Sequence, residues 1–285
     1  MKKLFKLFIC VLMVFVLASC NKKEEADTPK VKVIDVKLTD EQYAFVVKKG
    51  NTQLVEDFNA FLEEIKANKK FDEIVAKYFE NKGTKIGVSV ASGTVANTEN
   101  AFVIATNCPF SPFEYIGDDG LIYGIDIEIA KLYAESKGLT LVVKNILFDA
   151  IFSEVDAGYA DMGMAGITVN EDRLKSYDFT TPYYEASQKI VVAYDNTAFD
   201  NCKTAADVEN VLKSLSGQKV GYQNGTTGNW YVAGDADWGF EGFSNLQAVG
   251  YSTAQLAILD ITYGRIYAVV VDEAPAKAMV EAINK

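Results

Sequence analysis

The sequence predicts a two-lobed α/β protein. Its 285 residues are 49% hydrophobic, which suits a folded chain of one or two domains. Apolar strand-like runs alternate with helical patterns in two successive series, and this alternation is typical of βαβ units with mostly parallel sheets. A strand-like run at 189–194 lies between the series, so we expect it to join two lobes.

The first series begins with a short buried strand at Phe102–Thr106. A helix with one apolar face follows, and Gly138 stands where such a helix would end. Residues 141–144 and 161–165 predict two more strands, and residues 149–158 predict the short helix between them. Ligands of open parallel sheets bind at the carboxyl ends of strands, so the loops after these strands are candidate binding segments.

The second series repeats this pattern toward the C-terminus. It begins with a predicted helix at 204–215. Its strands are expected at 219–223, 246–251 and 266–271. Ser252 is expected to cap the helix between the last two strands, and the final helix is expected to begin near Pro275. We therefore expect a second sheet that is also covered by helices.

Residues 1–30 predict an export signal followed by a tether. Residues 1–19 have a lysine-rich start, an apolar run too short for a comfortable transmembrane helix, and small residues at the end, which is typical of a signal peptide. Small residues directly before Cys20 resemble a bacterial lipobox, which implies that Cys20 is lipidated. A plain signal peptide with an accidental cysteine is the alternative. Residues 20–30 would be the lipidated cysteine and a charged, flexible tether.

Charge and composition exclude several classes of function. The net charge is −11, and removal of residues 1–19 takes away three lysines and makes it −14, which disfavours nucleic acid and anionic lipid heads as partners. The absence of histidine excludes Ser-His and Cys-His catalysis and imidazole metal sites. Cys108 and Cys202 have no metal-ligand spacing, although a disulfide between them is open in an oxidising compartment. We expect neither a metal nor a cofactor.

Five segments from residue 102 onward resemble one known family. They are FVIATNCPFSPFEY (102–115), YGIDIEIAKLYA (123–134), ADMGMAGITVNEDRLKSYDFTTPYY (160–184), KVGYQNGTTGNWY (219–231) and GRIYAVVVDEAPAKAMV (264–280). In order and spacing they resemble the bacterial extracellular solute-binding proteins of the polar amino-acid type, the receptors of ATP-driven importers. The resemblance implies a type II periplasmic-binding-protein-like fold with mixed sheets and a two-strand hinge. It also implies a monomer that is no enzyme, binds a free L-amino acid and meets an ABC transporter permease.

The segment Leu38–Lys82 resembles the C-terminal end piece of the same family, although it stands near the front of this chain. This resemblance implies a circular permutant, and an unrelated N-terminal helical domain is the alternative. Residues 83–100 are rich in Gly, Ser, Thr and Asn and would be the permutation linker.

Permutation predicts lobes that are discontinuous in sequence. Lobe 1 would combine 44–82 with 101–188, and lobe 2 would combine 31–42 with 193–285. The crossing segments near Glu41–Val46 and Gln188–Ala193 would form the hinge. The lipid tether would attach to lobe 2 and hold an exported lipoprotein at a membrane, in the periplasm or on the outer face of the cytoplasmic membrane.

Arg173 is the candidate for binding a carboxylate. It is one of only two arginines, and a guanidinium presents a rigid fork that matches a carboxylate. It follows Asn170 at a predicted helix start, where backbone N–H groups also favour an anion. A surface arginine is the alternative, and Arg265 is interpreted as structural. The resemblance assigns Arg173 to the α-carboxylate of the ligand.

The resemblance implies further contacts to the backbone groups of the ligand. They come from Ala165, Gly166 and Thr168 in lobe 1 and from Thr226 and Thr227 in lobe 2. The lobe 1 residues would contact the carboxylate and the ammonium group, and the N–H groups of the lobe 2 residues would complete the carboxylate clamp only on closure. Asp272 would pair with the α-ammonium, although an N-cap for the following helix is the alternative or an additional role.

Four residues would surround the side chain of the ligand. Phe110 and Phe148 would be the walls, because small-ligand pockets are mostly apolar, and core packing is the alternative for such aromatics. Asn107 and Gln223 would face the ligand side chain. Family members that take Arg, Lys or His usually have an acid at the position of Asn107, so the neutral amide favours a neutral polar ligand such as glutamine.

Two other functions fit the same fold. A receptor subunit would report the amino acid to a sensor instead of a transporter. A dehydratase acting on a cyclohexadienyl substrate would need a buried general acid, and we expect no pocket carboxylate besides Asp272. Capture by hinge closure for ABC-type import is therefore the leading hypothesis.

Overall fold

The computed structural model describes residues 28–91 and 100–285. The strands are β1 Val31–Ile34, β2 Glu41–Tyr43, β3 Val46–Lys48, β4 Ala101–Thr106, β5 Tyr115–Ile116, β6 Ile122–Tyr123, β7 Thr140–Asn145, β8 Met162–Gly163, β9 Tyr177–Phe179, β10 Tyr184–Ala186, β11 Gln188–Ala193, β12 Lys219–Gln223, β13 Gln247–Tyr251 and β14 Ala268–Asp272. The helices are α1 Thr52–Ala67, α2 Lys70–Phe79, α3 Ile125–Ser136, α4 Phe148–Asp156, α5 Glu171–Ser176, α6 Ala205–Ser214, α7 Thr227–Ala233, α8 Ala254–Thr262 and α9 Glu273–Asn284.

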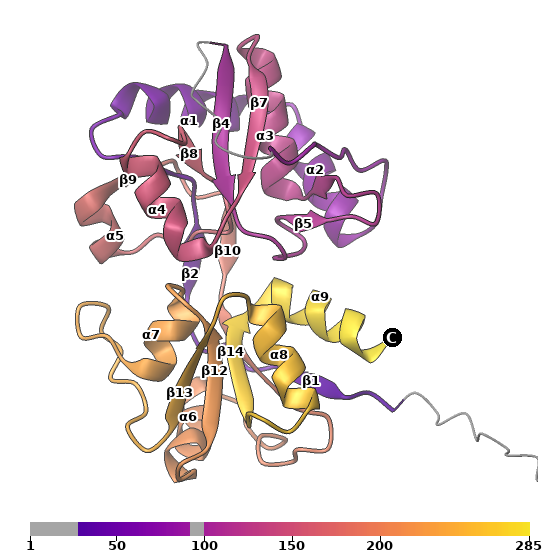
Figure 1. The fold of residues 1–285 in the computed structure, drawn as a ribbon, viewed down its shortest axis with the longest axis vertical. Helices are drawn as coiled ribbons and strands as arrows, with labels where there is room; N and C mark the ends of the chain where they lie inside the picture. Colours follow the sequence, from indigo (N-terminus) through magenta and orange to yellow (C-terminus); the bar gives the residue numbers. More distant parts are fainter. Residues whose placement is uncertain (1–27, 92–99) are drawn as a thin grey trace, which may run out of the picture.

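Two mixed five-stranded sheets form the two lobes (Figure 1). The first-lobe sheet has the order β7-β4-β8-β3-β9, and the second-lobe sheet has the order β1-β11-β14-β12-β13. In the first lobe β4 runs parallel to β7 and β8, while β3 runs antiparallel to β8 and β9. In the second lobe β12 runs parallel to β13 and β14, and β11 is antiparallel to β1 and β14. The predicted two-lobed α/β fold with mixed sheets is confirmed.

The front of the described chain contributes to both lobes. β1 is an edge strand of the second-lobe sheet, with Val31 opposite Ala193. β3 lies between β8 and β9 inside the first-lobe sheet, and α1 and α2 lie on the same lobe (Figure 1). An independent N-terminal helical domain does not fit this placement, because β3 is an internal strand of a sheet built mainly from later residues.

Two antiparallel strands pass between the lobes, namely β2 and β10, with Tyr43 opposite Tyr184. The expected first crossing near Glu41–Val46 agrees with β2. The second crossing was predicted at Gln188–Ala193, and that prediction is wrong by a few residues, because this run is β11 of the second-lobe sheet. β11 is almost wholly buried between β1 and β14, so its apolar run marks a strand inside the sheet.

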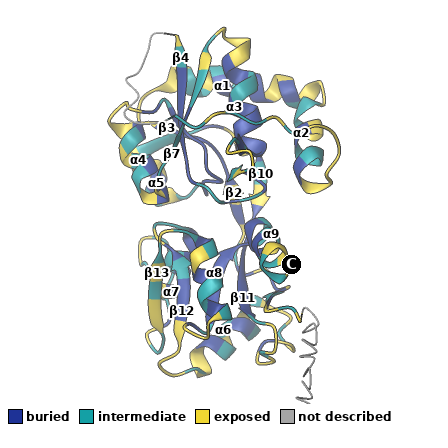
Figure 2. Ribbon diagram, turned by 45° about the vertical axis from the view of Figure 1, so that its right-hand side comes forward, coloured by how far each residue is buried: buried dark blue, intermediate teal, exposed yellow. Residues whose placement is uncertain are grey.

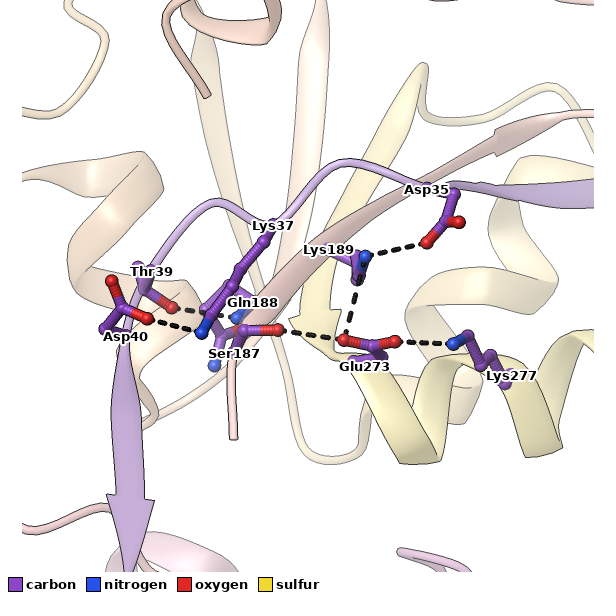
Figure 3. A network of polar contacts seen from close by, with 9 residues as sticks. All are labelled: Asp35, Lys37, Thr39, Asp40, Ser187, Gln188, Lys189, Glu273 and Lys277. Atoms are coloured by element: carbon purple, nitrogen blue, oxygen red, sulfur yellow. Dashed lines mark hydrogen bonds and ion pairs between the residues drawn. The ribbon is translucent and has the colours of Figure 1, made fainter. Parts of the chain in front are cut away.

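A buried lysine fixes the second-lobe side of the hinge (Figure 3). Lys189 lies 2.9 Å from Asp35 and 3.6 Å from Glu273, measured from its Nζ to the carboxylate oxygens. Glu273 also accepts a hydrogen bond from Ser187 at 3.1 Å and pairs with Lys277. A buried charge is costly unless it is paired, so this network holds β11 against α9 and the segment after β1.

The core of each lobe lies between its sheet and its helices (Figure 2). All five residues of β14 are buried, as expected for a strand covered on both faces. Helix α1 buries Phe58, Phe61, Leu62 and Ile65, which lie on one face at helical spacing. These cores hold the strand ends that face the other lobe in fixed positions.

One side chain joins the first and last described segments. Asn284 Oδ1 accepts hydrogen bonds from the N–H groups of Lys30 at 2.8 Å and Val31 at 3.2 Å. Its Nδ2 donates to the carbonyl oxygen of Val31 at 2.9 Å. Figure 1 shows the end of α9 near the start of β1, so these two ends are neighbours on the second lobe.

Part of the predicted linker packs on the first lobe. Val88 forms a β-bridge with Ile122, and the N–H of Ile86 donates to Glu128 at 2.9 Å. The same carboxylate binds Lys77 and Tyr78 of α2, each at 2.6 Å. Residues 83–91 are therefore partly held by α3 and β6, which an exposed linker would not be. Residues 92–99 lie outside the described residues.

Three local expectations are settled by the structure. Thr253 caps α8 by accepting the N–H of Leu256 at 3.3 Å, so the prediction of a Ser252 cap is wrong by one residue. Helix α9 begins at Glu273, and Pro275 lies in its first turn, where a missing N–H is tolerated. Cys108 and Cys202 are free thiols, so the possible disulfide is not formed.

The predicted signal peptide, Cys20 and most of the tether lie outside the described residues. Within residues 28–91 and 100–285, no helix combines the length and the hydrophobicity that crossing a bilayer requires.

Candidate functional site

A nearly closed cavity between the two lobes is lined by residues of both. Its lining residues are Asn107, Phe110, Glu114, Phe148, Ala165, Gly166, Thr168, Arg173, Gln223, Thr226, Thr227 and Asp272. Eleven of these are the residues predicted from the sequence, and Glu114 is the addition. The cavity volume is about 10 Å³, which is the space of roughly one water molecule. An amino acid can enter only if the lobes move apart and the lining side chains shift.

Strand ends bring the lining residues together. Asn107 directly follows β4, Gln223 is the last residue of β12, and Asp272 is the last residue of β14. Phe148 begins α4, three residues after β7. The carboxyl ends of parallel strands from both sheets therefore meet at one cavity, which is the usual position of ligands in open α/β sheets.

A buried carboxylate shapes the AGIT loop of the first lobe. Asp126 accepts hydrogen bonds from the N–H of Gly166 at 3.0 Å and from the hydroxyl of Tyr183 at 2.6 Å. Gly166 has a φ of +53°, and a Cβ on it would lie 2.7 Å from the ring of Phe110. Glycine is required here, because a side chain would be strained and would collide with the cavity wall. Burial raises the pKa of Asp126 to about 7.

Arg173 supplies the positive charge of the cavity wall, and only 7% of it is exposed. Asn170 is the N-cap of α5, and its side-chain oxygen accepts the N–H of Arg173 at 2.7 Å. The guanidinium donates to the carbonyl oxygens of Thr168 at 2.6 Å and of Gly225 at 3.0 Å. Burial lowers the pKa of Arg173 to about 10, so the group stays charged at neutral pH. The surface-arginine alternative does not fit, and Arg173 of the first lobe touches the second lobe directly.

Aromatic rings surround the outer side of the same guanidinium. Its central carbon lies 4.8 Å from the ring centre of Phe152, 5.2 Å from Trp230 and 5.3 Å from Trp238. The two indole rings stack on each other with centres 3.6 Å apart. Cation–π contacts of this kind strengthen when the cation is desolvated. The second lobe therefore covers Arg173 with two tryptophans, which the sequence-based prediction did not include.

Asp272 supplies a negative charge on the second-lobe side. The hydroxyl of Tyr43 donates to its carboxylate at 2.5 Å. The side chain makes no capping hydrogen bond to α9, although Asp272 occupies the N-cap position. Burial and the nearby charge of Glu41 raise the pKa of Asp272, and the Tyr43 hydrogen bond opposes part of that rise.

An amide pair crosses between the lobes at another part of the cavity. Gln223 Nε2 donates to Asn107 Oδ1 at 2.7 Å. Asn107 Nδ2 in turn donates to the carbonyl oxygen of Ile146 at 2.6 Å, which fixes the orientation of the amide. This last bond ties Asn107 to the end of β7, so it holds the strand end as well as lining the cavity.

Glu114 is the cavity residue that the sequence-based prediction missed. It has no exposed surface, and neither carboxylate oxygen has a hydrogen-bond partner among the described residues. Burial, together with the charges of Asp126 and Asp272, raises the pKa of Glu114 well above its usual range. The expectation that Asp272 is the only pocket carboxylate is therefore wrong. In the sequence the clue was an acid next to two prolines and two phenylalanines, a segment with little room for solvent.

Residues 102–285 match the model of one family, the bacterial extracellular solute-binding proteins, family 3. The chain belongs to this family. A probable histidine-binding protein of Neisseria gonorrhoeae is 27% identical over 66% of this chain and 68% of its own length. The ABC transporter arginine-binding protein 1 of Escherichia coli (strain K12) is 30% identical over 58% of this chain and 60% of its own length. The chain thus spans about three fifths to two thirds of these curated relatives.

Solved structures of similar proteins share the fold. The arginine-bound form of truncated ArgBP from T. maritima is 30% identical, with a TM-score of 0.56 over 64% of this chain and 78% of that chain. An ancestral arginine-binding protein bound to glutamine is 32% identical, with a TM-score of 0.54 over 65% of this chain and 75% of that chain. These relatives are binding proteins and not enzymes, in agreement with the prediction that the solute-binding protein described here is no enzyme.

Proposed function

We propose that this solute-binding protein captures a free L-amino acid between its lobes and delivers it to an ABC-type importer. The observation that carries the proposal is that residues of opposite charge line one buried cavity from the two lobes. Arg173 stands on the first lobe and Asp272 on the second, and both line the cavity. A zwitterion carries one group for each of them, since guanidinium binds carboxylate and carboxylate binds ammonium.

Capture would proceed by hinge closure. The ligand first meets Arg173 and the AGIT loop, residues 165–168, on the first lobe. The second lobe then brings Thr226, Thr227 and Asp272 over it, while β2 and β10 bend. Hinge closure around a ligand is an established mode of motion for two-lobed binding proteins. The Arg173 hydrogen bond to Gly225 supports closure at this residue, because it joins the two lobes directly.

A neutral polar side chain such as that of glutamine fits the amide pair best. Asn107 and Gln223 can each give and accept hydrogen bonds once their mutual bond opens, so together they match the donors and acceptor of a ligand amide. The ancestral arginine-binding protein bound to glutamine supports such a ligand by similarity. Phe110 and Phe148 would cover the aliphatic part of the side chain.

A cationic side chain is the second candidate, and Glu114 favours it. A buried carboxylate without a hydrogen-bond partner is costly, and a guanidinium or ammonium group would satisfy it. The relatives named for arginine and histidine support this ligand class by similarity. Both candidates share one property, a side chain that ends in N–H donors.

We further propose that the protein is a circularly permuted lipoprotein anchored through Cys20. The family match begins at residue 102, whereas β3, α1 and α2 come earlier and complete the first lobe. The contact between Asn284 and Val31 supports a chain reopened on the second lobe. A tether before β1 would then pull on the second lobe.

A thermal-unfolding screen of the lipid-free protein, residues 21–285, against the twenty amino acids tests the proposed function. A ligand at 100 times its Kd adds about 2.7 kcal/mol to the free energy of unfolding, which raises Tm by several degrees. We expect a shift with one or a few amino acids whose side chains end in N–H donors. No shift with any amino acid would refute the proposed function.

A further inference from the structure

Glu41 is a buried acid of the hinge strand β2, and it has no role in the capture mechanism proposed above. It is 7% exposed. Its Oε1 accepts the hydroxyl of Thr39 at 2.5 Å, and its Oε2 accepts the hydroxyls of Thr168 at 2.6 Å and Thr227 at 2.8 Å. Thr168 belongs to the first lobe and Thr227 to the second, so one carboxylate oxygen joins both lobes through two hydroxyl groups.

These hydrogen bonds determine the direction of the two hydroxyl protons. An ionised carboxylate only accepts hydrogen bonds, whereas a hydroxyl has one proton to give and two lone pairs. The hydroxyls of Thr168 and Thr227 therefore both donate their protons to Glu41. Both residues also line the cavity, so what their oxygens can offer a ligand is acceptor capacity.

Thr39 fixes Glu41 in this position. Its hydroxyl oxygen accepts the N–H of Gln188 at 2.8 Å while its proton goes to Glu41. Figure 3 shows Thr39 and Gln188 beside the Lys189 network that anchors this part of the hinge. The carboxylate is thus held by the hinge itself, and its position does not depend on a ligand.

The cavity wall next to Glu41 is rich in acceptors. Asp272 is close enough that the charge of Glu41 acts on it, and Asp272 accepts its own hydrogen bond from Tyr43. Thr168, Thr227 and Asp272 therefore all present acceptor oxygens to the same cavity, and the proposed function puts the α-ammonium beside Asp272. An ammonium group has three donors and no acceptor, which matches such a wall.

We infer that Glu41 is a positioning residue that turns the Thr168 and Thr227 hydroxyls into acceptors and thereby makes the closed site require a free α-ammonium group. The inference rests on the proposed function, because it needs an amino acid in the cavity. It assigns Glu41 a role in selecting amino acids over their deaminated analogues. Because one threonine comes from each lobe, the acceptor set is complete only when the lobes are closed.

Calorimetric titration with two matched ligand pairs tests the inference. The pairs are L-glutamine with glutaramic acid, and L-arginine with 5-guanidinopentanoic acid, each differing by the α-amine alone. For whichever amino acid the wild type binds, we expect loss of the amine to weaken binding by about 100-fold or more, since several hydrogen bonds to a charged group are lost together.

Glu41→Met keeps the side-chain length but removes the acceptor, so the threonine protons can turn into the cavity and oppose the ammonium. We expect it to weaken amino-acid binding by about 10- to 100-fold and to change binding of the deaminated analogue by less than about threefold. Glu41→Gln keeps one acceptor oxygen, so its affinity for the amino acid should lie between those of the wild type and Glu41→Met. Thr227→Val, which removes one hydroxyl at constant shape, should lower the same affinity ratio by a smaller factor and carries the test if Glu41→Met does not fold.

Glu185→Gln is the matched control, because Glu185 is an exposed acid of the partner hinge strand β10 and bonds Gln42 at 2.8 Å. It should leave both affinities unchanged. Equal loss of affinity for both members of a pair in the Glu41 variants would mean that Glu41 only supports the hinge, which overturns the inference. If the wild type binds no amino acid at all, both the proposed function and the inference fail. If the wild type binds an amino acid and the Glu41 variants lose affinity equally for both members of a pair, only the inference fails.

Discussion

The anchoring residues of the cavity and Glu114 differ in how far the protein satisfies their polar groups. At the anchoring end, Arg173, Thr168 and Asp272 all have hydrogen-bond partners in the protein. Glu114, which also lines the cavity, is fully buried and has no hydrogen-bond partner among the described residues. An unsatisfied buried carboxylate costs free energy, which native structures tolerate mainly at functional sites. Under the proposed function, we therefore expect the anchoring end to bind any amino acid and Glu114 to select among side chains.

Replacing Arg173 should break the anchoring end and have the largest effect. We expect Arg173→Ala to weaken amino-acid binding by at least about 30-fold, because losing one partner of a buried charge pair costs about 2–5 kcal/mol. Arg173→Lys should recover only part of this loss, since an ammonium lacks the forked geometry. Calorimetric titration measures both.

The chain provides a matched control for this prediction in its other arginine. Arg265 is exposed and pairs with Asp260 at 2.9 Å, outside the cavity lining. Arg265→Ala should bind normally. Equal binding by Arg173→Ala and the wild type would contradict the division into an anchoring end and a selecting end.

Replacing Glu114 should change selectivity more than stability. We expect Glu114→Gln to weaken a cationic ligand by about 10- to 100-fold and an amide ligand by up to about tenfold, because hydrogen bonds to a carboxylate are the stronger ones. The Tm should not fall, since the carboxylate has no partner to lose. Calorimetry on the amino acid found in the screen and a thermal melt decide both points.

Glu128→Gln is the matched control for Glu114→Gln, because Glu128 is also a buried carboxylate. Glu128 is bound by Lys77, Tyr78 and the N–H of Ile86, outside the cavity lining. The substitution should lower Tm by several degrees and leave affinity unchanged. If instead Glu114→Gln lowers Tm and leaves affinity intact, Glu114 is a structural residue and does not select the ligand.

Lowering the pH should weaken amino-acid binding and raise the free energy of unfolding. The pKa of Asp272 is raised, and an ammonium ligand favours its ionised form, so affinity should fall as pH drops below about 7, by at most about tenfold per pH unit. The pKa of Asp126 is raised to about 7, so its contribution to stability is full below its unfolded value near 4 and is lost as pH rises toward 7. Titrations and melts between pH 5 and pH 8 measure both trends. A parallel fall of affinity and Tm on acidification would contradict this assignment.

Asn284→Ala should have the smallest effect and touch neither end of the cavity. It removes three hydrogen bonds that hold Lys30 and Val31 to the end of α9. We expect a loss of about 1 kcal/mol in the free energy of unfolding, which lowers Tm by a few degrees, and no change in affinity. Asn201→Ala, an exposed loop change, is the control that should alter neither quantity.

The anchoring end could be predicted from the sequence because its residues follow strands with recognisable patterns. The eleven predicted residues all line one cavity, and their ligand contacts stay a prediction. Glu114 and Glu41 could not be predicted in the same way. Glu41 lies in a short polar segment, and Glu114 follows a segment with two prolines and two phenylalanines. Each is buried only because distant segments pack around it.

The hinge was misplaced for a related reason. The run 188–193 is apolar enough to predict a strand, but a strand pattern does not reveal which sheet the strand joins. The true crossing strands, β2 and β10, are three residues each and mix buried with exposed positions. Such short pairs carry little periodicity, so only the assembled sheets locate them.

The stacked indole rings beside Arg173 have a consequence for observing this molecule at work. Trp230 and Trp238 are the chain's only two tryptophans, and both meet a cation that belongs to the opposite lobe. If the lobes separate as the proposed capture requires, the indole rings lose that cation and become exposed to water, and both changes alter indole emission. The wavelength of intrinsic tryptophan emission should therefore report opening and closing of the lobes, and it can be followed over time in unlabelled protein.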